Sequence, residues 1–188
     1  MKYLKYILGI VAILVIVFFL LGIIKPELSY NCEIMVDKPL AESWAVSQDV
    51  EKMSDWLVGF QKFEHVSGTP NTIGAVSDVY FITDGQEMVI RETITGIVPN
   101  ESVSMSFTSD FMDMDYILSM VSIDGKTKVR TSTKAKGNGI ISKSIMALME
   151  NSMETQEETN LSHLQKTIEN NTKNYVIKTE DSIQINNN

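Results

Sequence analysis

The chain has 188 residues, 24 acidic and 16 basic, and a formal net charge of −8 at neutral pH. Lys2, Lys5 and Lys25 flank an apolar segment, which leaves residues 26–188 with 13 basic against 24 acidic groups, a net charge of −11. Such a domain repels phosphates, so nucleic acid is excluded as a partner. Because Cys32 is the single cysteine, no internal disulfide forms, and we expect it to be a small buried apolar group.

Residues 7–24 are 18 consecutive apolar positions. As a helix they span roughly 27 Å, which suits a hydrocarbon core of about 30 Å. No small-residue cleavage pattern follows the segment, so we predict an uncleaved single-pass anchor over residues 1–25. Basic residues are more frequent before it than after it. This bias predicts a cytoplasmic N-terminus, with the rest of the chain on the periplasmic or extracellular side of the cell (inner) membrane.

The next elements follow in chain order after a linker over residues 25–28. The sequence predicts a strand over 30–36, a helix opened by Pro39 and a short helix over 50–57. From Phe60 the pattern has period two, with turn signals at 68–71, 84–85, 99–100 and 124–125, which predicts a meander of six strands. A long helix is predicted over 140–170. Its apolar residues form two stripes, the first with Ile141, Ile145, Leu148, Met149 and Ser152, the second with Leu161, Leu164 and Ile168.

This order predicts an α+β fold in which a curved antiparallel sheet of about seven strands wraps around the long C-terminal helix. Thr127, Val129, Thr131, Thr133 and Ala135 alternate with charged residues, so we expect them to face the helix. Curved sheets often leave a cavity for apolar ligands. The many methionines suit either such a cavity or plain core filling, and both interpretations stay open. Residues 171–188, rich in asparagine, are predicted to be a disordered tail, within which residues 175–177 are a candidate docking stub.

Four segments resemble a known superfamily. They are EIMVDKPLAESWAVSQDVEKMSDWL, GTPNTIGAVSDVYF, RETITGIVPNESVSMSF and the strand around DGKTKVR. Residues 26–170 are thereby similar to the START-like SRPBCC superfamily, in its polyketide cyclase/dehydrase-type branch. The resemblance implies the helix-grip fold and a hydrophobic cavity between sheet and helix. It also implies functions from lipid carriage to ring closure, so it predicts a pocket and not a reaction.

The chemistry-bearing residues indicate no metal, no cofactor and no assigned catalytic residue. His65 and His163 lack metal-ligand spacing, and no nucleophile elbow is present. Glu92 is different, because its alternation places it on an apolar strand face, where burial would raise its pKa. The alternative interpretation is that a bulge, or a position at the open end of the strand, exposes Glu92 or pairs it with Arg91, Arg130 or a lysine. The ligand-cavity candidates are Trp56, Tyr80, Met88, Ile90, Glu92, Met105, Phe107, Met114, Tyr116, Met120, Ile145 and Met149.

Three functional hypotheses follow from these features. The first is a membrane-tethered module that binds a lipid or another small hydrophobic molecule in the cavity. The second is a cyclase or hydratase that uses Glu92 with Tyr80 or Tyr116 as acid and base. The third is a protein-interaction domain, in which the acidic surface or the tail recruits a basic partner.

Overall fold

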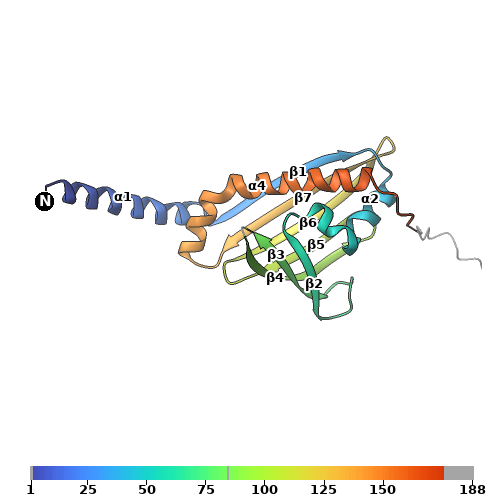
Figure 1. Ribbon diagram of the computed structural model, residues 1–188, viewed down its shortest axis with the longest axis horizontal. Helices are drawn as coiled ribbons and strands as arrows, with labels where there is room; N and C mark the ends of the chain where they lie inside the picture. Colours follow the sequence, from blue (N-terminus) through green and yellow to red (C-terminus); the bar gives the residue numbers. More distant parts are fainter. Residues whose placement is uncertain (1, 84, 176–188) are drawn as a thin grey trace, which may run out of the picture.

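The computed structural model describes residues 2–83 and 85–175. One long helix, α1 (Lys2–Ile24), extends from one end of the molecule, and the remaining elements form a curved sheet with helices on one side (Figure 1). The span Tyr3–Ile24 has the length and composition of a membrane-crossing helix or of a signal sequence, and most of it is exposed. Only its last turns touch the rest of the chain, where Gly22 is buried.

The sheet has seven antiparallel strands. They are β1 (Glu27–Val36), β2 (Phe60–Ser67), β3 (Val76–Thr83), β4 (Gln86–Val98), β5 (Ser102–Thr108), β6 (Met112–Ile123) and β7 (Lys126–Gly137). Their order in the sheet is β1-β7-β6-β5-β4-β3-β2. Each strand from β2 to β7 therefore pairs with the next one in the chain, as predicted for the meander, and β1 pairs with β7 at the edge of the sheet. The predicted seven-stranded fold is confirmed.

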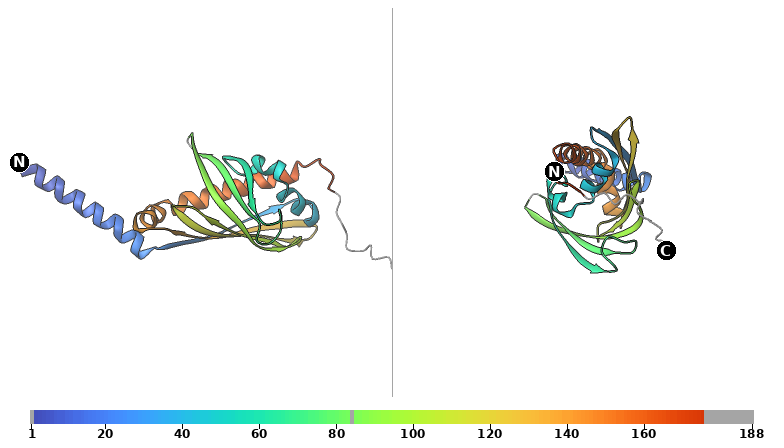
Figure 2. Two further views of the ribbon diagram at one scale, coloured as in Figure 1. Left: turned by 90° about the horizontal axis from the view of Figure 1, so that it is seen from below. Right: turned by 90° about the vertical axis from the view of Figure 1, so that its right-hand side faces the viewer.

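Two short helical segments and one long helix complete the domain. The short ones are α2 (Leu40–Ser47) and a turn of 3-10 helix (Val50–Lys52) that runs into α3 (Met53–Trp56). Asp49 begins the 3-10 turn by accepting a hydrogen bond from the backbone N–H of Glu51 at 3.0 Å, as an N-capping carboxylate does. The long helix is α4 (Ile140–Glu169), which lies along the inner, concave face of the arc-shaped sheet (Figure 2).

Alternation along the strands decides which residues meet α4. On β7 the residues Thr127, Val129, Thr131, Thr133 and Ala135 are buried, and the lysines and arginine between them point to the convex face. Residues that are directly paired on neighbouring strands point to the same face of the sheet. The pairing therefore shows which residues of the other strands share the concave face with these β7 residues. The face predicted for β7 is therefore the concave face.

The largest core cluster lies at the end of the sheet away from α1. There, residues of the sheet pack against Leu161, Leu164 and Ile168 of α4 and against Trp56 of α3; the strand residues are Cys32, Val36, Val103, Leu118, Met120 and Val129. A smaller cluster near α1 contains Leu28, Ala135 and Met146, with Met112, Met114 and Met153 packed around it. The second predicted stripe of α4 is thus confirmed as core.

Two expectations need correction. β1 begins at Glu27 and not at residue 30, so the predicted linker over residues 25–28 is only Lys25–Pro26. The first predicted stripe of α4 is not a packing face, since Ile141, Leu148 and Met149 are exposed and Ser144 and Met146 are buried in their place. In the predicted tail, Tyr175 packs back onto the domain at the start of the candidate docking stub, and its hydroxyl donates to Asp49 at 2.7 Å. Residues 176–188 lie outside the described part.

Cys32 provides a test of the core. Its side chain is 6 % exposed, and burial raises the pKa of its thiol to about 11. Thiolates are the reactive form, so we expect iodoacetamide to leave Cys32 unmodified in the folded protein and to modify it fully after denaturation, as intact mass measures. A Met35→Cys variant, at an exposed position of the same strand, should be labelled at once. Rapid native labelling of Cys32 would contradict this packing.

Candidate ligand-binding site

One row of paired residues crosses the whole concave face near α1. Each member directly opposes the next on the neighbouring strand; from β2 to β1 the row contains His65, Ser77, Glu92, Phe107, Met114, Ala135 and Leu28. Leu28 closely follows the end of α1, so this row lies at the end of the sheet beside that helix. Glu92 is the single carboxylate in the row, between a serine and a phenylalanine.

Glu92 is half-buried, and its carboxylate has no partner among the described residues. Burial raises the pKa of its carboxyl to about 7, and within the described residues it forms neither a hydrogen bond nor an ion pair. Arg91 points to the convex face, where it forms a bidentate ion pair with Asp78. Its Nε donates to Oδ1 at 2.9 Å and its Nη2 donates to Oδ2 at 3.0 Å. The bulge of β4 comes later, between Ile94 and Gly96. Within the described residues neither a bulge nor a basic partner relieves Glu92, and its carboxyl stays partly accessible.

A second carboxylate reaches the concave face from α4. Glu157 accepts a hydrogen bond from the hydroxyl of Tyr116 at 3.0 Å. Burial raises the pKa of Glu157, and the hydroxyls of Thr131 and Tyr116 partly offset this effect. The pKa of Tyr116 is raised well above its usual range, first by burial and then by the charge of Glu157. This pair joins the helix to the middle of the sheet.

Hydroxyl groups surround this pair. Tyr30, Thr133 and Tyr116 oppose one another across β1, β7 and β6. Thr131 lies one pair further along, and its Oγ1 is buried without a well-formed hydrogen bond in the part of the chain described. We call Tyr30, Tyr116, Thr131, Thr133 and Glu157 the polar centre. It separates the two apolar clusters, so a molecule on the concave face near α1 would meet polar groups at its inner end.

Packing on the concave face loosens toward α1. At the far end Val103, Leu118 and Met120 are each at most 5 % exposed. Toward α1 the same face carries side chains that are only partly buried, namely Ile94, Met105, Phe107, Met112 and Met114. Met88, which opposes Phe81 at the concave side of β4, is 45 % exposed. The apolar surface that α4 leaves uncovered thus lies beside Glu92.

The candidates named from the sequence separate into groups. Those on the part of the concave face toward α1 are Met88, which is exposed, and Glu92, Phe107 and Met114, which are partly buried. Ile90 is buried, Met105 packs against the far core cluster, and Tyr116 belongs to the polar centre. Trp56 and Met120 lie in the far core. Ile145 is half-buried on α4, and Met149 is 45 % exposed. Tyr80 lies on the convex face, where its hydroxyl donates to Glu64 at 2.7 Å, so it does not meet Glu92.

Sequence reasoning missed Glu157. The residues of α4 that meet the sheet are Met146, Met153, Glu157, Leu161, Leu164 and Ile168, which follow helical spacing. A carboxylate that interrupts such a stripe is a signal of a buried acid. The expectation that the first apolar stripe is the packing face conceals this signal.

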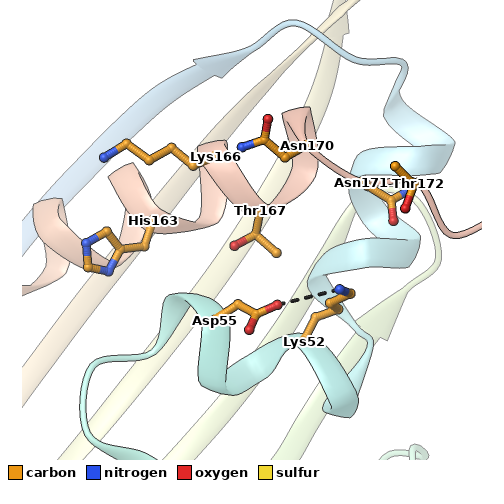
Figure 3. A pocket seen from close by; sticks show the side chains of 8 residues that line it. All are labelled: Lys52, Asp55, His163, Lys166, Thr167, Asn170, Asn171 and Thr172. Atoms are coloured by element: carbon orange, nitrogen blue, oxygen red, sulfur yellow. Dashed lines mark ion pairs between the residues drawn. The ribbon is translucent and has the colours of Figure 1, made fainter.

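A separate hollow lies between α3 and the last turns of α4, away from α1. Its lining is polar and includes an ion pair of Lys52 with Asp55 at 3.6 Å, beside His163 and Lys166 (Figure 3). This lining does not suit an apolar ligand, and none of the sequence candidates belongs to it. In the described residues no three His, Cys, Asp or Glu side chains are grouped to hold a metal ion.

No protein-family model and no curated protein matches the chain. Solved structures do. Ara h 8.0201 is 15 % identical, with a TM-score of 0.61 over 77 % of this chain and 99 % of that one. The aromatase/cyclase Zhui from Streptomyces sp. R1128 is 14 % identical, with a TM-score of 0.61 over 76 % and 94 %. The di-domain ARO/CYC StfQ from the steffimycin pathway is 9 % identical, with a TM-score of 0.63 over 77 % and 51 %.

These likenesses define a class of fold. The structures are Bet v1-like and SRPBCC proteins, and this chain shares their helix-grip arrangement of a seven-stranded sheet around a long C-terminal helix. With identities of 9–15 %, the likeness extends to the fold alone.

Proposed function

We propose that this protein is an SRPBCC-type binding module, anchored in a membrane, that takes up a small hydrophobic molecule or lipid on its concave face. The observation that supports the proposal is the group of partly exposed apolar side chains of β4, β5 and β6 beside the unpaired carboxyl of Glu92. A half-buried carboxyl without a partner costs free energy, so it is expected to serve a ligand.

The chemistry of the face suggests an amphipathic ligand. Partly exposed methionine and phenylalanine side chains adapt to apolar bodies of different shape. With a pKa of about 7, Glu92 is partly protonated at neutral pH, so it donates a hydrogen bond to a carbonyl or accepts one from a hydroxyl. The expected ligand is therefore an apolar molecule with one or two uncharged polar groups.

The anchor supports the same proposal. The helix α1 is long and apolar enough to cross a bilayer, and Lys25–Pro26 alone separates it from β1. With the N-terminus in the cytoplasm, as the flanking charges favour, the domain stands at the outer surface of the cell (inner) membrane. The uncovered surface lies at the α1 end of the sheet, which under this proposal faces the lipid.

A second candidate function is favoured by one observation. A carboxyl with a pKa near 7 is matched to proton transfer at neutral pH, and Tyr116 lies two strands away on the same face. In that case the domain is a cyclase- or hydratase-type enzyme with Glu92 as proton donor. Tyr80 takes no part, because it faces the other side of the sheet.

Native mass spectrometry of the full chain, purified from membranes in detergent, tests the proposal. We expect a bound mass that denaturation removes. A Met88→Glu variant, which puts a charge on the uncovered surface, should lower the bound fraction at least tenfold, since an unpaired charge beside an apolar ligand costs more than about 1.4 kcal/mol. The matched control is Met35→Glu, at a position of similar exposure on the convex side of β1.

Equal loss of bound mass in both variants, or no bound mass even after incubation with lipid extract, would contradict the binding proposal. A bound molecule that the wild type converts and a Glu92→Gln variant only binds would favour the enzyme.

A further inference from the structure

The first predicted stripe of α4 is apolar, follows helical spacing and is not covered by the domain. We call Ile141, Ile145, Leu148 and Met149 the α4 stripe. Ile141 and Leu148 are 58 % and 63 % exposed. Phe111 is also exposed, and its carbonyl accepts a hydrogen bond at 2.9 Å from Asn138 just before α4, so it lies close to the start of the helix. Surfaces of this kind mark interaction sites.

The α4 stripe begins where α1 ends. Gly22, in the last turn of α1, lies so close to α4 that a Cβ atom there would be 2.5 Å from Ser144 Oγ and 3.0 Å from the carbonyl oxygen of Ile140. At Gly9, by contrast, a Cβ would meet nothing within 4 Å. Lys25 adds an ion pair with Glu150 at 2.6 Å. Both views in Figure 2 show the first turns of α4 beside the end of α1.

This contact fixes the depth of the α4 stripe. If α1 crosses the bilayer, its last turn lies at the boundary between acyl chains and headgroups. The first turns of α4 then lie at that same boundary, because Gly22 touches Ile140 and Ser144. Amphipathic helices at this level bury their apolar face about 5–10 Å into the boundary.

We propose that the α4 stripe is a bilayer-docking surface, which inserts into the acyl-chain boundary next to α1. This inference rests on the proposed membrane anchoring and adds a second contact between the domain and the same leaflet. It explains why Ile141, Leu148 and Met149 are apolar although the domain does not bury them. A second copy of the chain is the competing occupant.

Quenching by brominated lipid tests the proposal. The full chain is reconstituted in phosphatidylcholine vesicles with and without dibrominated phosphatidylcholine, and tryptophan emission is compared between variants. Leu148→Trp should lose most of the emission that the added indole contributes. Thr155→Trp, at an exposed position further along α4, should lose little. The wild type supplies the background from Trp44 and Trp56, which lie on α2 and α3 at the other end of the domain.

The outcomes distinguish failure of the membrane anchor from failure of docking by the α4 stripe. If the wild-type chain is extracted from vesicles by alkaline carbonate, the anchor itself fails. If the chain stays inserted but Leu148→Trp is quenched no more than Thr155→Trp, docking is overturned while anchoring stands. A dimer that protects Leu148→Trp from bromine also overturns it. Ile141→Trp repeats the test should Leu148→Trp alter the circular dichroism spectrum.

Discussion

Replacing Glu92 by glutamine should remove a large pH dependence of stability. The native carboxyl has a pKa of about 7, raised by burial from 4.5, so the native state keeps its proton to higher pH than the unfolded state does. Raising the pH through this window therefore destabilises the native state, by about 3 kcal/mol in total at 1.36 kcal/mol per unit of pKa. The variant should not lose this stability.

The measurement is urea unfolding of the full chain in detergent at pH 5 and pH 8, followed by tryptophan fluorescence. Wild type should lose more free energy of unfolding than Glu92→Gln between the two pH values, and the difference isolates this residue from Glu157. Glu87→Gln makes the same change at an exposed, convex position of β4 and should keep the wild-type dependence. Parallel behaviour of wild type and Glu92→Gln would show that Glu92 is solvated.

Shortening Leu164 should cost far more stability than shortening Leu148, although both leucines are on α4. Leu164 is fully buried in the core cluster that holds the helix to the sheet. Leu164→Ala should therefore lower the free energy of unfolding by about 2–5 kcal/mol. Leu148 is 63 % exposed, so Leu148→Ala should change it by less than about 0.5 kcal/mol.

Urea unfolding of both variants in detergent measures this contrast. A large loss for Leu148→Ala would mean that the first half of α4 packs into the domain after all. A small loss for Leu164→Ala would mean that the helix-grip core is misplaced.

The strands were predictable because their pattern is redundant. On β7 five alternating residues agree on one face, and register transmits that choice across the sheet. The start of β1 was missed because the polar residues Glu27 and Ser29, on the exposed face, give the segment little strand character. Its pairing with β7 extends the strand to Glu27. Tyr80 was assigned to the wrong face because adjacent residues of a strand face opposite sides. Its neighbour Val79 faces the concave side, so Tyr80 faces the convex side.

On α4 periodicity identified apolar faces but not what covers them. Leu161, Leu164 and Ile168 meet the sheet, whereas Ile141 and Leu148 follow the same spacing and stay largely exposed. Glu157 escaped notice for a related reason, because a single carboxylate on a helix is usually solvated and only the position of Tyr116 shows that it is not. The local signal, a carboxylate that interrupts an apolar stripe, can be recognised only when the stripe that meets the sheet is known.

The two-residue connection between α1 and β1 has a kinetic consequence for the proposed uptake. A domain held by Lys25–Pro26 and by the contact at Gly22 meets only the leaflet in which α1 ends. A lipid made in the opposite leaflet must first cross the bilayer, so its spontaneous flip-flop, or a flippase, would limit the rate of loading. In vesicles with the ligand confined to one leaflet, loading should be fast from the near side and as slow as flip-flop from the far side.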